Sequence, residues 1–132
     1  MAEFPFINKY GKITYYNPDD AFVRHHTYII LECETEVLCV YRKEEDLYTL
    51  PSLEDLQVNG KLAAEWTTLS YLTENRRPIK ETQTYRVYTV KKDKLPDEAF
   101  QWCKIDDILL GKIAFDCTQL VGIKNLIVRS KE

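Results

Sequence analysis

Apolar and β-branched residues in the first third of the chain predict β-strands. The runs His26–Glu32 and Glu36–Lys43 are rich in β-branched and aromatic residues, and a short polar link joins them. We therefore expect a β-hairpin at this point of the chain. A shorter strand is expected at Lys12–Tyr16, between Gly11 and the turn-forming residues 17–20.

Between Gly60 and Arg76 the apolar spacing changes and predicts a helix. Apolar side chains recur there at intervals of three or four residues: Leu62, Trp66, Leu69 and Leu72. Ala64 favours a helix, and Pro78 would end it. The expected helix buries its Leu62, Trp66 and Leu69 face.

Strand periodicity returns after this segment. Thr82–Val90 carries large residues at both alternating sets of positions, which is typical of a central strand covered on both faces. A short strand, Phe100–Cys103, and a helical turn, Ile105–Leu110, are expected next. An amphipathic helix over Asp116–Val128 would direct these residues inward: Leu120, Ile123, Leu126 and Ile127. The order β-β-β-α-β-β-α predicts a mixed α/β layered domain.

Length and composition indicate one globular domain over residues 1–132. Hydrophobic residues make up 45% and charged residues 30% of the chain. The net charge of −3 argues against nucleic-acid partners, and no apolar run approaches the length of a membrane span. The first residues lack the basic and apolar regions of a secretory signal. We therefore expect a soluble, cytoplasmic protein in a reducing compartment.

The cysteines and histidines do not indicate a metal site. The four cysteines, Cys33, Cys39, Cys103 and Cys117, form no C-x2-C pair, and neither His25 nor His26 has zinc-like spacing to them. Cys39 and Cys103 lie in apolar strand contexts, which predicts buried free thiols.

Three local matches in the right order make residues 12–130 similar to the Nudix hydrolase superfamily. The first is the strand pair that ends in Leu50-Pro51, and the second is the expected helix followed by a long strand. The third is a strand followed by a short helix near the C-terminus, carried by Phe100, Trp102, Ile105, Asp106, Asp107, Ile108 and Leu109. The resemblance implies an α/β (α+β) fold in which a mixed β-sheet is sandwiched between helices.

The family holds divalent metal with glutamates of a loop-helix-loop box, and these glutamates are missing here. If Pro51 is the family proline, Asn59 replaces the first glutamate and Thr67-Thr68 replace an arginine-glutamate pair. Tyr71 and Leu72 replace the two glutamates that hold metal. Shifting the alignment does not restore the pattern, because Glu65 has no acid three or four residues further on. We therefore expect no metal and no cofactor on this segment.

Two functional interpretations remain open. The first is a catalytically silent Nudix-like domain that binds a nucleotide-related small molecule or a protein partner, with a pocket formed by Tyr48, Thr68, Tyr71 and Leu72. The alternative is a divergent hydrolase of a nucleoside diphosphate derivative. It would use carboxylates outside the box, first Glu54 and Glu81, and only this alternative calls for Mg²⁺.

Overall fold

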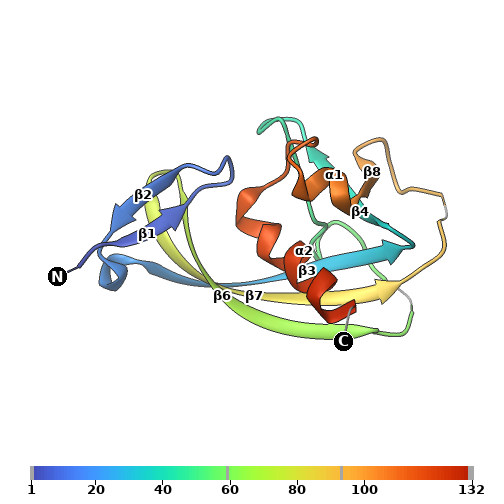
Figure 1. Cartoon of the computed structure of the whole chain (residues 1–132), viewed down its shortest axis with the longest axis horizontal. Helices are drawn as coiled ribbons and strands as arrows, with labels where there is room; N and C mark the ends of the chain where they lie inside the picture. The colour runs from blue at the N-terminus through green and yellow to red at the C-terminus, as the bar shows by residue number, and fades with distance from the viewer. Residues whose placement is uncertain (1, 59, 93, 131–132) are drawn as a thin grey trace.

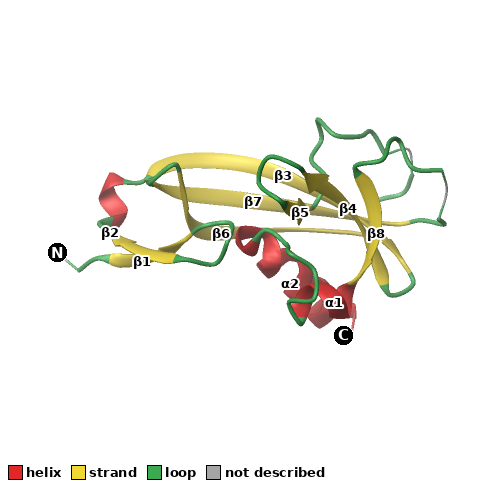
Figure 2. Cartoon of the chain, turned by 90° about the horizontal axis from the view of Figure 1, so that it is seen from above, coloured by secondary structure: helices red, strands yellow, loops and turns green. Residues whose placement is uncertain are grey.

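The computed structural model describes residues 2–58, 60–92 and 94–130, which form a curled mixed sheet with two helices (Figure 1). Both helices lie on the same side of the long strands in Figure 2. The strands are β1 (Phe4–Ile7), β2 (Ile13–Tyr16), β3 (Phe22–Cys33), β4 (Glu36–Arg42), β5 (Leu47–Thr49), β6 (Ala64–Glu74), β7 (Arg77–Thr89) and β8 (Phe100–Lys104). The helices are α1 (Ile105–Leu109) and α2 (Leu120–Ser130), with 3-10 turns η1 (Pro18–Asp20) and η2 (Cys117–Gln119). This mixed sheet with two helices confirms the expected α+β fold class, whereas the two helices lie on one side of the long strands and do not sandwich the sheet between them.

The sheet has the order β2-β1-β6-β7-β3-β4-β5, and β8 pairs with β4. β7 lies at the centre, antiparallel to β6 and parallel to β3. Its alternate residues from Ile79 to Val87 are buried, whereas the set from Lys80 to Tyr88 is half-exposed. The central position was predicted correctly, but full cover of both faces was not.

The predicted helix over residues 60–76 is wrong, because this segment forms β6. Trp66 and Leu72 are buried on one face of the strand, whereas Leu69 is 56% exposed. Leu62 lies before the strand and is 41% exposed, so the expected buried face does not exist. Eleven register pairs with β7 fix the strand, and this long-range pairing overrides the helical spacing.

The turn after β6 explains how the chain forms this hairpin. Asn75 and Arg76 both adopt positive φ, at 52° and 62°. Two central residues with positive φ make the type I′ turn that matches the twist of a two-stranded ribbon, and asparagine tolerates this conformation well. Pro78 therefore lies inside the β7 strand, not at the end of a helix.

The other predicted elements are confirmed, with two additions. β3 and β4 form the expected hairpin, β2 and β8 match their predicted runs, and α1 and α2 match the expected C-terminal helices. β1 was missed, and it pairs with β2 over four residues. β5 was read only as an approach to Leu50-Pro51, yet it forms a short edge strand on β4.

The helix α2 covers the buried face of β7 at a close approach. A Cβ atom on Gly122 would lie 2.3 Å from the Tyr85 ring, so only glycine fits at this crossing. Tyr85 lies at 0% exposure in the main core cluster, together with Ile123 and Leu126 of α2. This contact sets the distance between the helix and the sheet.

Candidate functional site

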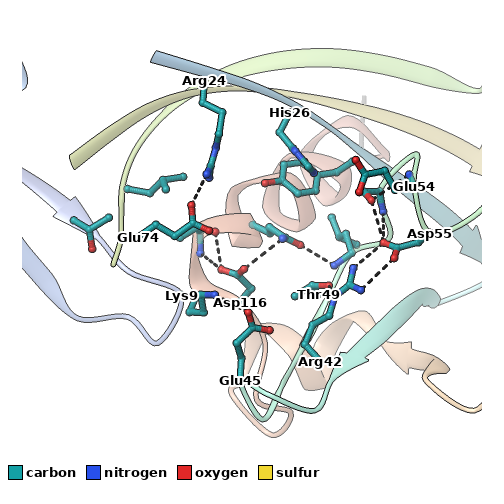
Figure 3. Close-up of a pocket in the computed structure, with 17 residues that line it drawn as sticks. Lys9, Arg24, His26, Arg42, Glu45, Thr49, Glu54, Asp55, Glu74 and Asp116 are labelled. Carbon is teal, nitrogen blue, oxygen red and sulfur yellow. Dashed lines mark hydrogen bonds and ion pairs between the residues drawn. The ribbon is translucent and has the colours of Figure 1, made fainter. Parts of the chain in front are cut away.

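A polar cleft of about 370 Å³ opens on the helix-bearing side of the sheet, between β3, the segment after β5, the end of β6 and η2. Figure 3 shows its side chains converging from these elements. The charged residues that line it are Lys9, Arg24, Arg42, Glu45, Glu54, Asp55, Glu74 and Asp116. They come from positions that are far apart in the sequence.

A fully buried carboxylate, Glu81, lies behind the cleft. One of its oxygens accepts hydrogen bonds from the Arg24 guanidinium at 2.6 Å, and the other accepts from Tyr28 Oη at 2.6 Å and Gln83 Nε2 at 3.0 Å. Burial and the nearby Glu81 charge raise the pKa of Tyr28 well above its usual range, so its hydroxyl stays a donor. Glu81 is therefore saturated by groups of the chain itself.

Gln83 extends this network below the helix. Its amide oxygen accepts from Ser70 Oγ at 2.9 Å and Tyr85 Oη at 2.8 Å, and its nitrogen also donates to the Thr118 carbonyl at 2.9 Å. A buried amide with all of these partners links β6, β7 and η2. The floor of the cleft is thus held by hydrogen bonds that leave little freedom.

One wall of the cleft is the loop that follows β5. The Arg42 guanidinium binds both carboxylate oxygens of Asp55, at 3.1 and 2.7 Å, and its Nε donates to Thr49 Oγ1 at 3.0 Å. Asp55 also accepts from the Ser52 backbone N–H at 2.8 Å. Burial opposes the charge of Asp55, but these hydrogen bonds outweigh it and hold the pKa of the carboxyl below its usual range.

The opposite wall is built by η2 and the chain around Lys9. Lys9 Nζ lies 2.9 Å from Glu45 Oε1, and Asp116 accepts from the Thr118 hydroxyl and backbone N–H. Gln119 Oε1 accepts from the Leu50 N–H at 2.7 Å and so ties this wall to the other. Burial raises the pKa of Asp116, although its bonds to Thr118 and the Lys9 charge oppose the shift.

The cationic side chains in the cleft are all occupied. Lys9 pairs with Glu45, Arg42 with Asp55, and Arg24 with both Glu74 and Glu81. The lining holds three cations, Lys9, Arg24 and Arg42, against five acids, Glu45, Glu54, Asp55, Glu74 and Asp116. An anionic ligand would therefore have to displace a carboxylate of the chain.

His26 is the aromatic group of the cleft that is open to a ligand. Its ring centroid lies 4.5 Å from that of Tyr28, which supports it from the buried side. Within the described part of the chain, the His26 ring has no hydrogen-bond partner. This side chain offers a ring face and nitrogen atoms at the cleft surface.

The four predicted binding residues, three from the expected helix and Tyr48 from the segment before it, do not share one pocket in the structure. Leu72 lines the cleft, but Tyr71 packs against Phe4 and Phe6 of β1. Tyr48 points away and donates to Gln101 Oε1 at 2.7 Å. Thr68 lies on β6 beside α2, in a separate pocket. A strand directs alternate residues to opposite faces, so a site built on helical spacing could not form.

The two carboxylates of the hydrolase interpretation have different environments. Glu54 is exposed on the cleft rim, whereas Glu81 is buried behind Arg24 and Tyr28. Asn59, the first replaced box position, lies outside the described residues. In residues 50–58 and 60–63 there is no helix, so the box segment does not form a metal-holding face here. Among the described side chains, no cluster of three or more acidic, histidine or cysteine residues is arranged for a metal ion.

Several cleft residues were not predicted from the sequence. Arg24, His26 and Tyr28 occur at every second position of β3, so they share one face of that strand. This alternation was a readable signal for one wall of the site. Arg42 and Asp116 carried no such local signal, because they join the cleft only through the fold.

Comparisons with known proteins agree with the fold. No protein-family model and no curated protein matches the chain. The structure is similar to that of an Ap4A hydrolase from C. elegans, a Nudix enzyme, with a TM-score of 0.54 and 12% sequence identity. The similarity covers 84% of this chain and 99% of that one. No helix in the described part of the chain is long and apolar enough to cross a membrane. The structural similarity over most of both chains shows that this chain has a Nudix-like fold.

Proposed function

We propose that the chain is a non-hydrolytic Nudix-like domain whose cleft binds the nucleoside part of a nucleotide-related small molecule. The observation that carries the proposal is the distribution of charge in the cleft. Its three cations are paired with carboxylates, while the His26 ring and the Glu54 carboxylate face the opening. Groups of this kind suit a neutral polar ring compound.

The chemistry of a nucleoside matches these groups. A base can stack on His26, which the Tyr28 ring supports at 4.5 Å between centroids. Ribose hydroxyls are donors, and the exposed Glu54 carboxylate is an acceptor. A phosphate group binds best to a cation without another partner, and the three described cations of the cleft are all paired with carboxylates.

The proposal that the cleft does not hydrolyse its ligand rests on Glu81. A carboxylate that served a metal or a water molecule would have to release Arg24, Tyr28 and Gln83, and it has no exposed surface. Glu54 alone cannot replace a set of family glutamates, since Mg²⁺ needs several oxygen ligands in a near-octahedral arrangement.

The test is a thermal melt of the protein with nucleosides and nucleotides, with and without Mg²⁺. The structural neighbour is an Ap4A hydrolase, so adenosine, its phosphates and Ap4A come first. A ligand at ten times its Kd stabilises the native state by about 1.4 kcal/mol, a rise in Tm of about 5 °C for a domain of this size. We expect nucleosides to raise Tm as much as their phosphates do, with no effect of Mg²⁺.

His26→Ala should abolish the rise in Tm, and His25→Ala is the matched control. His25 is the preceding residue on β3, is exposed and does not line the cleft. No Tm change with any ligand would overturn the binding proposal. Phosphate release in Mg²⁺ or Mn²⁺ that Glu54→Gln or Glu81→Gln abolishes would instead establish the hydrolase alternative.

A further inference from the structure

β6 has an open edge along most of its length. It pairs with β7 from Ala64 to Glu74, whereas β1 reaches it only at the Ile7–Leu72 pair. In the described part of the chain, residues 64–71 pair with no strand other than β7, and in Figure 1 β6 forms the lower border of the sheet. Alternate backbone N–H and C=O groups of such an edge point outward and can pair with an added strand.

A second pocket, of about 290 Å³, opens between this edge and the C-terminal half of α2. We call it the β6-edge pocket. It is lined by Trp66, Thr67, Thr68, Asn125, Val128 and Arg129. The three helical residues are spaced i, i+3 and i+4, so they form one face of α2 above the strand.

Two of the residues that line this pocket each carry a buried polar atom without a partner in the described part of the chain. Trp66 is 6% exposed, and neither its Nε1–H nor Thr68 Oγ1 makes a hydrogen bond there. Trp102 Nε1 is the third such atom among the described residues and lies elsewhere. Buried donors without acceptors are unfavourable, so two of them in one pocket indicate a place for an acceptor from outside.

The charge beside these donors specifies the acceptor. The Arg129 guanidinium lies 4.7 Å from the Trp66 ring centroid, over its face, and has no carboxylate partner among the described residues. Its exposed side chain can turn from the ring toward a bound group. An indole N–H, a hydroxyl and an unpaired guanidinium together complement a carboxylate.

We propose that an extended segment of a partner protein adds to the open edge of β6 and places an aspartate or glutamate side chain in the β6-edge pocket. Backbone pairing with residues 64–71 supplies affinity, and the pocket supplies selectivity for the acid. A free carboxylate would gain little, because a single ion pair near the surface is weak. Three exposed apolar residues can contact side chains of the segment. Leu69 lies on β6, Leu62 precedes it, and Val128 lines the β6-edge pocket.

The experiment is a selection of random heptapeptides from a display library on the full chain. We expect enrichment of peptides with an acidic residue at one fixed position and β-branched residues at alternate positions. The best peptide is then synthesised with a fluorophore, and its Kd is measured by anisotropy. Replacing its acid by the matching amide should weaken binding about tenfold, since it removes the charge that Arg129 binds.

Variants of the protein locate the site. Arg129→Gln should weaken the peptide about tenfold, and Trp66→Phe, which keeps a ring but removes the N–H, about threefold. Lys124→Gln is the matched control, because Lys124 is exposed on α2 and lies outside the pocket. Hydrogen exchange should show protection of the backbone amides of residues 64–71 in the complex.

Four results would overturn the proposal. They are a selection that enriches no peptide, enrichment without a fixed acidic position, equal effects of Arg129→Gln and Lys124→Gln, and protection at a different edge such as β2. A fifth such result is complete displacement of the peptide by acetate at matched concentration with the β6 amides unprotected, because it would show a site for small anions only. The nucleoside melts test a different cleft, so either proposal can fail while the other stands.

Discussion

The cleft and the β6-edge pocket lie at opposite ends of one row of aromatic rings. The polar groups at the cleft end are hydrogen-bonded within the chain, whereas those at the other end are not. The row runs His26, Tyr28, Tyr85 and Trp66, with successive centroids 4.5, 5.3 and 5.8 Å apart. At the cleft end, the hydroxyls of Tyr28 and Tyr85 bind Glu81 and Gln83. At the edge end, Trp66 Nε1 and Thr68 Oγ1 have no partner in the described residues.

The two ends of the row differ in whether the chain satisfies its own buried polar groups. A buried polar group with its partners rigidifies the fold, whereas one without partners reduces the stability of the folded state. The cleft floor therefore belongs to the stable scaffold. The β6-edge pocket is the part of this row for which we propose an external partner.

The largest expected effect comes from removing the buried charge at the cleft end. Glu81→Gln leaves Arg24 without its buried carboxylate and should lower the free energy of unfolding by about 3 kcal/mol. Glu65→Gln is the control, because Glu65 pairs with Arg86 at 2.9 Å on the surface and both side chains are over 40% exposed. That change should cost about 0.5 kcal/mol or less. Urea unfolding followed by circular dichroism measures both, and equal values would contradict the scaffold role of Glu81.

A change in the middle of the row should affect both ends. Gly122→Ala puts a Cβ 2.3 Å from the Tyr85 ring, so α2 must move away from the sheet. We expect a loss of about 2 kcal/mol and weaker ligand binding at both sites. Gly60→Ala adds a Cβ with no atom within 4 Å and should be nearly neutral. An unchanged Gly122→Ala protein would mean that the helix is not held against Tyr85.

The next prediction concerns pH at the cleft wall. The pKa of Asp55 is depressed in the fold from an ordinary value of 3.8, because Arg42 and Ser52 hydrogen bonds outweigh the effect of burial. Its contribution to stability is complete above that value and is lost as pH falls through the folded pKa. Asp55→Asn should be about 1.5 kcal/mol less stable near pH 7 and should lose less stability than the wild type below about pH 4. Urea unfolding at several pH values checks this, and parallel curves would contradict it.

The smallest effect on stability is expected at the β6-edge pocket, and it tests most directly whether the polar groups there lack partners. Thr68→Val replaces an unpartnered hydroxyl with an isosteric methyl group, so stability should stay within about 0.5 kcal/mol or rise. Tyr28→Phe removes the hydroxyl that donates a hydrogen bond to Glu81 and should lower the free energy of unfolding by about 1.5 kcal/mol. If Thr68→Val were the more damaging change, Thr68 would have a partner within the fold. Thermal melts of the two variants decide between these outcomes.

Local patterns in the sequence predicted much of the fold but little of the site. The β3–β4 hairpin, β8 and α2 were readable because their neighbours in sequence form the relevant periodicity. Leu72 and Glu54 were the predicted residues that line the cleft. Thr68 and Tyr71 were assigned to one pocket through a helix that does not exist, and Tyr48, from the segment before Leu50-Pro51, was added to the same pocket. The strand sends Thr68 and Tyr71 to different surroundings.

The absence of the acids of a Nudix box can be established from the residues alone, and local patterns predict most strands and the last helix. Long-range contacts in the fold were needed to show that residues 64–74 form a strand, because pairing with β7 satisfies their backbone while local spacing favoured a helix. They were also needed to show that Lys9, Arg24, Arg42 and Asp116 share one cleft, since no local pattern records contacts between residues so far apart. The loss of the box therefore follows from residue identities, whereas the composition of the cleft depends on contacts that only the folded chain makes.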